Sequence, residues 1–151
     1  MSDTRWMEEA LALAREAAAN GETPVGCVIV DEAKGEIVAR GANAPIGRHD
    51  PGAHAEMLAL RAAGEALGNY RLREGLTLFV TLEPCTMCAG AMSAARIARV
   101  VYGASDPKGG AVESGVRFFE APTCHWRPQV TGGVMANESA ELLRTFFKAR
   151  R

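Results

Sequence analysis

Apolar and polar residues follow two different periods along the chain. Helical spacing, with an apolar residue at every third or fourth position, predicts helices over 6–18, over 54–67, from about Pro84, and over 137–150. Asn137 or Ser139 is expected to cap the start of the last helix. Apolar runs bounded by turn residues predict strands at 25–30, 37–42, 76–82 and 98–104. Alternating helices and strands indicate an α/β protein with a three-layer α/β/α arrangement.

The segments between these elements add detail to the fold. A turn over 31–36 would join the first two strands as a hairpin, so the sheet should be mixed. Residues 43–52 contain two prolines and two glycines and are predicted to form a loop. Within 111–133 the pattern supports only a short helix near 112–121 and a short strand near 127–131. Because no linker or internal repeat interrupts the chain, a single domain over 1–151 is expected.

Composition and charge give few restrictions on function. The chain is 48% hydrophobic and 23% charged, with a formal net charge of −1, as in ordinary globular proteins. No apolar run approaches the roughly 18 residues of a membrane helix, and the acidic N-terminal segment does not resemble a secretory signal, so a cytoplasmic location is expected. The final segment, "RTFFKARR", is basic. It is either a solvated helix end or a local patch for nucleic acid.

The chain has four cysteines, and two of them form a C-x-x-C motif, Cys85 and Cys88. Disulfides are not expected in a protein without an export signal. Pro84 favours the first turn of a helix, which would place both sulfurs on one helix face, since residues three positions apart share a face. The helix N-terminus also favours thiolates. The motif therefore predicts a metal site or a redox pair.

Further metal ligands would have to come from His49, His54, His125, Cys124 or Cys27. Cys27 lies in an apolar strand and is expected to be a small buried hydrophobe. Cys124 and His125 are adjacent, and neighbours in sequence rarely point at one metal ion. His49 lies in a loop and fits a turn or the substrate side better. His54 is the best candidate because a glutamate follows it two positions later.

The stretch "HAEMLALR" places His54 and Glu56 at the start of a predicted helix. In a regular helix these two side chains would diverge by about 200°. At the first turn both can lean over the helix end into a cavity. One histidine and two cysteines leave the fourth tetrahedral position of Zn²⁺ for water, whose pKa zinc lowers toward about 7. Glu56 could then accept and pass on its proton.

Each motif alone has a simpler explanation. Glu56 could be a helix-capping or surface residue, and C-x-x-C could be a redox motif. The ordered combination H-x-E followed by P-C-x-x-C is far more specific. It matches the established signature of the zinc-dependent nucleoside and nucleobase deaminases, the cytidine-deaminase-like superfamily. The resemblance implies that His54, Cys85 and Cys88 bind Zn²⁺ and that Glu56 is the catalytic proton shuttle.

Within that superfamily the chain resembles the bacterial tRNA-specific adenosine deaminases over nearly its whole length. The segments that carry the resemblance are "TPVGCVIV", "NAPIGRHDPGAHAE", "NYRL", "TLEPCTMCAGAM", "RVVYGASDPK" and "ELLRTFFKARR". The family implies a mixed five-stranded sheet with helices on both faces, and a homodimer with active sites near the interface. It also implies that adenosine is converted to inosine at the wobble position of an arginine tRNA anticodon.

The resemblance further implies contacts with the RNA. Candidate substrate-binding residues are Asn43, Asp106, Phe147, Arg150 and Arg151. Asn43 could instead be a loop-turn residue and Asp106 an Asp-Pro turn former. Either Phe146 or Phe147 is expected in the core, because helical spacing rarely exposes both. Ala44 departs from the family, which often has arginine there, so a phosphate or base contact is weakened.

Two other functions fit the same motifs. The first is deamination of a free base or nucleoside such as guanine, cytosine or cytidine, which would use the same zinc and glutamate. The second is a non-catalytic binding module stabilised by zinc, in which Glu56 would have no chemical role. The basic C-terminal helix and the 43–52 loop favour a macromolecular substrate.

Overall fold

The computed structural model describes residues 2–150, which include a five-stranded sheet in the order β2-β1-β3-β4-β5. The strands are β1 (Gly26–Asp31), β2 (Glu36–Ala42), β3 (Leu76–Leu82), β4 (Arg99–Ala104) and β5 (Gln129–Thr131). Strand β1 is antiparallel to both β2 and β3, whereas β3, β4 and β5 run parallel. The predicted hairpin, the mixed sheet and the short strand near 127–131 are confirmed.

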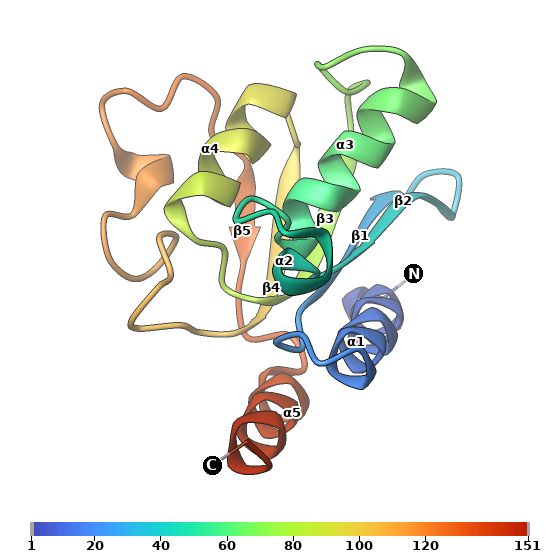
Figure 1. Ribbon diagram of the computed structural model, residues 1–151. Helices are drawn as coiled ribbons and strands as arrows, with labels where there is room; N and C mark the ends of the chain where they lie inside the picture. The colour runs from blue at the N-terminus through green and yellow to red at the C-terminus, as the bar shows by residue number, and fades with distance from the viewer. Residues whose placement is uncertain (1, 151) are drawn as a thin grey trace.

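Helices cover both faces of this sheet. They are α1 (Asp3–Ala19), the short α2 (Pro45–Arg48), α3 (Ala55–Leu67), α4 (Thr86–Ala95), α5 (Ala136–Lys148) and a 3-10 turn, η1 (Phe118–Glu120). Helices α3 and α4 lie on one face, and α1 and α5 lie on the other (Figure 1). This is the predicted three-layer α/β/α arrangement. Within residues 2–150, no helix has both the length and the apolar character needed to cross a membrane.

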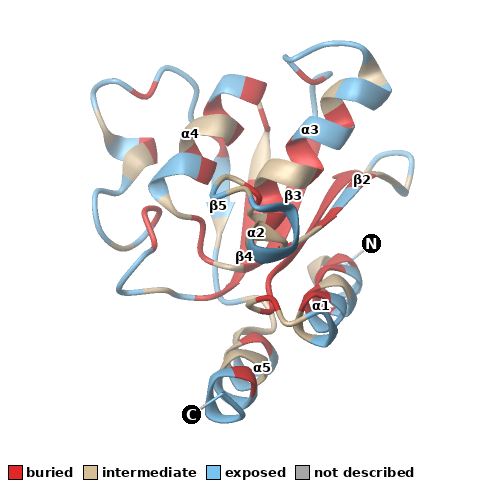
Figure 2. Cartoon of the chain, in the orientation of Figure 1, coloured by how far each residue is buried: buried red, intermediate tan, exposed pale blue. Residues whose placement is uncertain are grey.

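Alternation along the strands divides the core between the two faces, because successive strand residues point to opposite sides of a sheet. Cys27 and Ile29 pack toward α3 and α4, whereas Val28 and Val30 pack toward Trp6 and its neighbours on α1. In Figure 2 the central strands β1, β3 and β4 are largely buried, the edge strands β2 and β5 are more exposed, and the longer helices are buried on their inner sides. The sheet thus forms a rigid support for the loops at its edge.

Two strand glycines let helices approach the sheet closely. A methyl group on Gly26 would lie 2.6 Å from the Ala14 nitrogen on α1, and one on Gly41 would lie 2.8 Å from the Ala59 nitrogen on α3. Real Cβ atoms essentially never come within 3.0 Å of another atom. Glycine is therefore required where α1 and α3 cross the hairpin.

The predicted starts of the first and last helices were wrong. The first helix begins at Asp3, not at residue 6, and Ser2 caps it by accepting from the Arg5 amide at 3.4 Å. The last helix begins at Ala136 after Met135, so neither Asn137 nor Ser139 caps it. Ser139 is buried inside the helix and its hydroxyl donates to the Thr81 carbonyl, a tertiary contact that the local pattern does not reveal.

Two loop regions also differ from the prediction. The loop 43–52 contains helix α2, with Pro45 at its first turn. The expected helix near 112–121 is reduced to η1, which covers only residues 118–120. The prediction that Pro84 and Cys85 lie in the first turn of a helix was also wrong, because α4 begins at Thr86, with Cys85 as its N-cap and Pro84 before it.

Candidate metal centre and active site

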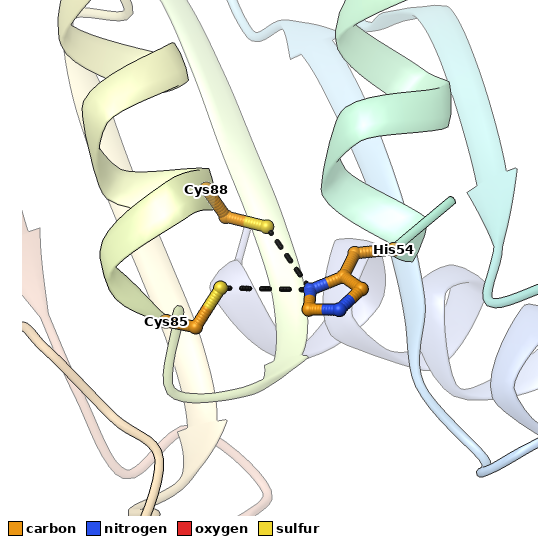
Figure 3. Close-up of side chains that lie close together, drawn as sticks. All are labelled: His54, Cys85 and Cys88. Atoms are coloured by element: carbon orange, nitrogen blue, oxygen red, sulfur yellow. Dashed lines mark hydrogen bonds between the residues drawn. The ribbon is translucent and has the colours of Figure 1, made fainter. Parts of the chain in front are cut away.

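Three metal-binding side chains meet at the starts of two neighbouring helices. His54 is the N-cap of α3, Cys85 is the N-cap of α4, and Cys88 lies in the first turn of α4. The His54 Nδ1 atom lies 3.5 Å from the Cys85 sulfur and 3.4 Å from the Cys88 sulfur (Figure 3). The backbone is extended at His54 and at Cys85, where the chain enters each helix, and the side chains of both residues are directed at one point.

The geometry of this cluster fits a zinc ion. All three potential ligand atoms lie within 4.8 Å of one another. Tetrahedral Zn²⁺, with bonds of about 2.3 Å to sulfur and about 2.1 Å to nitrogen, separates these ligands by about 3.6 Å. The two measured sulfur–nitrogen distances are within 0.2 Å of that value. Thiolate and imidazole are also the ligand types that zinc prefers over oxygen-binding ions such as Mg²⁺.

The electrostatics of the metal-free cluster show how its ligands share protons. A hydrogen bond from Cys88 lowers the pKa of Cys85 to about 4, against the opposing effect of burial. Donating that hydrogen bond, together with burial, raises the pKa of Cys88. The pKa of His54 is raised mainly by its hydrogen bond with Cys85. One sulfur is thus already a thiolate, and the other must lose its proton to bind a metal ion.

Glu56 lies beside the cluster and is 4% exposed. Burial raises the pKa of its carboxyl group to about 7, and the negative charge at Cys85 adds to this effect. His54 stands before the helix and Glu56 in its first turn, so both line one cavity although they are two residues apart. A carboxyl group that titrates near neutral pH can both accept and donate a proton there.

The cavity in front of the cluster has a volume of about 340 Å³, within the range of small-molecule sites. Its walls are formed by Thr23, Val25, Asn43, Pro45, His54, Glu56, Leu82, Glu83, Cys85, Asp106 and Gly109. A larger hollow of about 770 Å³ lies beyond Asn43, along α1, β2 and α3, and contains none of the clustered residues. We assign the smaller cavity to the chemistry because it holds the metal-binding groups.

Asn43 and Asp106 both line this cavity and form part of its rim. The Asn43 side-chain amide donates to the Thr23 carbonyl at 3.2 Å, which fixes its orientation. Asp106 Oδ1 accepts from the amides of Lys108 at 3.3 Å and Gly109 at 3.1 Å. Asp106 therefore forms the turn that was one of its two expected roles, and it also lines the cavity as the other role requires.

Two buried glutamates that the sequence did not reveal fix the loops at this rim. Glu22 accepts from the amides of Ile46 and Gly47 at the start of α2, at 3.1 and 2.7 Å. Glu83 accepts hydrogen bonds from the loop after β4. Burial raises the pKa of Glu83, but these amide donors outweigh it, so the pKa lies below its ordinary value. In the sequence, the one signal for each was its position: Glu22 directly precedes a Thr-Pro pair and Glu83 directly precedes a Pro-Cys pair.

The remaining candidates lie outside the cavity. Phe146 is buried, as expected for one of the two phenylalanines, and Phe147 is 48% exposed. The Arg150 guanidinium lies 3.6 Å from the centre of the Phe146 ring. Arg151 falls outside the described residues, so its predicted role is not addressed by the structure. Cys27 is fully buried, as predicted.

Cys124 and both other histidines are likewise absent from the cluster within residues 2–150. Cys124 is buried and donates to the Trp126 carbonyl at 3.2 Å, and His125 is exposed. His49 is exposed at the end of α2, in a left-handed conformation with φ of 51°. None of these residues joins the metal-binding group.

Comparison with known proteins agrees with this geometry. Residues 1–104 match the family model of the cytidine and deoxycytidylate deaminase zinc-binding region. A tRNA-specific adenosine deaminase of Agrobacterium fabrum is 55% identical over 148 residues, which is 98% of this chain and 95% of that protein. The chain belongs to this deaminase family. It is a hydrolytic deaminase, and its cofactor is Zn²⁺.

Two solved structures are informative for the substrate question. One comes from a study of A-to-I editing by tRNA:A34 deaminases at the wobble position of transfer RNA; it is 55% identical, covers 93% of this chain and 99% of its own, and has a TM-score of 0.88. The other is a guanine deaminase from Bacillus subtilis, 40% identical over 70% of this chain and 66% of its own, with a TM-score of 0.65. The family thus places very different substrates on one fold.

Proposed function

We propose that the protein converts adenosine to inosine at the wobble position of a tRNA anticodon, with arginine tRNA as the substrate. The observation that carries the proposal is the meeting of His54, Cys85, Cys88 and Glu56 at one cavity. The similarity to tRNA-specific adenosine deaminases over nearly the whole chain supports adenosine as the reacting base.

In the proposed mechanism His54, Cys85 and Cys88 hold the zinc ion. Bound zinc supplies a Lewis acid that makes hydroxide available from water near neutral pH. Glu56 accepts a proton from the attacking water, delivers it to the purine ring, and then assists departure of the amino group. The C6–N bond breaks, a C6–O bond forms, and adenosine plus water gives inosine plus ammonia.

The cavity must receive the base in an unstacked state. A base in an anticodon loop leaves its stack more readily than one in a duplex, which favours loop RNA as the substrate. We assign Asn43 to hydrogen bonding with the inserted nucleotide, because Thr23 fixes its orientation at the rim. Asp106 faces the same cavity and would contact the RNA backbone or a 2′-hydroxyl.

The C-terminal helix is proposed to contact flanking RNA. Phe147 is exposed and can stack on a base, and Arg150 and Arg151 supply positive charge for phosphates. Arg150 also lies over the Phe146 ring, which supports a fixed orientation for its guanidinium.

We further propose a homodimer built from one chain-long domain (1–151) and located in the cytoplasm. A hollow of about 650 Å³ between α3 and α4 supports the dimer, since it is lined largely by apolar side chains that include Met57, Leu60 and Ala91. Tyr70 beside it is 72% exposed. Sedimentation that gives only a monomer at micromolar concentration would contradict the dimer.

The test measures inosine formation on an arginine-tRNA anticodon stem-loop, beside free adenosine, cytidine, cytosine and guanine. We expect inosine in the stem-loop, no reaction of the free compounds, and RNA binding that weakens with salt because phosphate contacts release counterions. Product from guanine alone would replace the RNA proposal with the guanine deaminase activity named for the Bacillus subtilis neighbour. The Glu56→Ala variant, with intact zinc, is the matched inactive control.

A further inference from the structure

We propose that Glu83 is a positioning residue that fixes the loop 105–114 against the cavity and thereby sets the affinity for the RNA substrate. This inference rests on the proposed function. Glu83 follows the last residue of β3 and precedes Pro84, so its backbone leads directly into the metal centre. Its side chain meets the loop that follows β4.

The Glu83 carboxylate, in a residue only 3% exposed, accepts five hydrogen bonds from this loop. Oε1 accepts from the Asp106 amide at 2.9 Å and from the Ser114 hydroxyl at 3.0 Å. Oε2 accepts from the amides of Val112, Glu113 and Ser114 at 3.1, 3.0 and 2.9 Å. The two ends of the loop are thereby joined through one side chain.

The loop also has contacts that do not involve Glu83: the Glu113 carboxylate accepts from the Tyr102 and Ser105 hydroxyls, and Ala111 and Val112 are buried. Ser105, Lys108, Gly109 and Glu113 are exposed. The main chain adds contacts at Ala111, whose amide donates to the Pro84 carbonyl at 2.8 Å and whose carbonyl accepts from the Phe118 amide at 2.7 Å. A buried amide that loses its acceptor is costly, so the four loop amides that donate to Glu83 depend on its carboxylate for their placement.

Gly110 shows how closely the loop wraps around this carboxylate. A methyl group at this position would lie 2.5 Å from Glu83 Oε2 and 2.6 Å from the Asp106 carbonyl oxygen. The space that a side chain would occupy is filled by the carboxylate itself. The loop and Glu83 therefore form one closely packed unit.

The position of this loop matters because it forms one wall of the catalytic cavity. Asp106 and Gly109 line that cavity together with His54, Glu56 and Cys85. The Asp106 carboxylate is committed to its own turn through Oδ1, so the whole turn moves as a unit. Release of the Asp106 amide from Glu83 would free the turn to shift.

Glu83 itself is unsuited to proton transfer although it borders the cavity. A carboxylate offers about four lone-pair sites, and this one already accepts five hydrogen bonds. A group so fully engaged has no site left for a substrate proton. Its effect on the reaction must therefore pass through the loop that it holds.

The variant Glu83→Gln tests this role with no change in shape. In one orientation its NH₂ group would face three backbone amides, and in the other it would face the Asp106 amide. We expect KM for the stem-loop to rise about tenfold or more, as for a misplaced positioning group, with a smaller change in kcat. Zinc content should equal that of the unaltered protein.

Glu22→Gln is the matched control, because Glu22 holds a different loop, the one that contains α2. Glu22 is also 3% exposed and accepts two backbone amide hydrogen bonds, from Ile46 and Gly47. In the double variant Glu22→Gln/Asp106→Ala, the fold-change in KM should equal the product of the two single fold-changes, because Glu22 and Asp106 belong to different loops. In contrast, adding Glu83→Gln to Asp106→Ala should raise KM by less than about threefold, because the effects of residues in one hydrogen-bond network are not additive.

Amide hydrogen exchange gives a readout that needs no substrate. Glu83→Gln should speed exchange at 106 and 112–114 and leave the strands β1 and β3 protected. Ser114→Ala, which removes only the hydroxyl donor, should raise KM in the same direction by less, and it covers the case in which Glu83→Gln does not fold.

Three results would overturn the inference: an unchanged KM, multiplicative effects of Glu83→Gln and Asp106→Ala, or loss of zinc from Glu83→Gln. Loss of zinc would mean that Glu83 supports Cys85 instead of the loop. If the unaltered protein does not deaminate the stem-loop, the proposed function fails separately. Hydrogen exchange then still decides whether Glu83 holds the loop, and unchanged exchange would reject that role.

Discussion

Substitution of Gly41 by alanine should disrupt the metal centre indirectly, by displacing the start of helix α3. Gly41 lies on β2, and its Cα faces the first turn of α3, which carries His54 and Glu56. An added methyl group would lie 2.8 Å from the Ala59 nitrogen and closer still to the Ala55 carbonyl oxygen. Both are backbone atoms and cannot turn aside as a flexible side chain would.

The size of the effect follows from these distances. Ordinary contact begins at 3.4 Å, so the start of α3 must retreat by at least 0.6 Å from the sheet. Metal–ligand distances in a working site hold to about 0.2 Å. The His54 Nδ1 atom would therefore leave its place opposite the two sulfurs. We expect weaker zinc retention, a fall of about 10²-fold in kcat/KM, and a loss of about 1 to 3 kcal/mol of stability from overpacking.

Three measurements on purified Gly41→Ala test this prediction: zinc content after dialysis, stem-loop deamination and urea denaturation. Gly64→Ala is the control, because it lies in the same helix and its methyl group would meet only the Asn69 carbonyl oxygen at 3.4 Å. The control should keep its zinc and gain up to about 1 kcal/mol from better helix propensity. Full zinc retention and normal activity in Gly41→Ala would refute the reasoning.

Three other outcomes are expected. Glu56→Gln should keep its fold and zinc but lose about 10²- to 10⁴-fold in kcat, and normal turnover would exclude Glu56 as the proton carrier. Zinc binding to the metal-free protein near neutral pH should release at least one proton, because the pKa of Cys88 is raised, so affinity should fall as the pH falls. Calorimetry in buffers of different ionisation enthalpy measures this release, and identical heats would argue against it. Asp3→Asn should cost about 1 kcal/mol at pH above the ordinary Asp3 pKa of 3.8, because Arg99 holds that pKa down by binding both carboxylate oxygens at 2.9 and 2.6 Å. The difference in unfolding free energy from the unaltered protein should vanish as the pH falls through the lowered pKa. Urea denaturation at two pH values tests this, and a difference that persists at low pH would show that the ion pair is not the cause.

Local patterns in the sequence were sufficient for the layers and for the centre of the site. Strand β3 matches the predicted residues 76–82, because a continuous apolar run between turn residues has few other uses. His54, Cys85 and Cys88 were found because metal ligation imposes a fixed spacing on each motif. Within each motif these signals lie only a few residues apart.

The missed features depend on contacts between distant residues. Helix α2 forms where a loop was predicted, and its first amides are satisfied by Glu22, far away in sequence. Glu83 similarly holds residues that follow the next strand. A buried glutamate that accepts hydrogen bonds from backbone amides produces no periodic pattern, so in the sequence it cannot be distinguished from a surface glutamate. Ser139 was assigned to a cap for the same reason, since its partner Thr81 belongs to another element.

The order of elements along the chain has a consequence for how this enzyme class can diversify. All three proposed zinc ligands and Glu56 occur by residue 88, on segments that precede β4 and β5 in the sequence. The loop with Asp106, strand β5 and helix α5 come later and surround a centre that is already encoded. Mutations in that later part can change what is recognised while the chemistry is inherited unaltered. Guanine and tRNA adenosine deaminases on one fold are the outcome expected from such an arrangement.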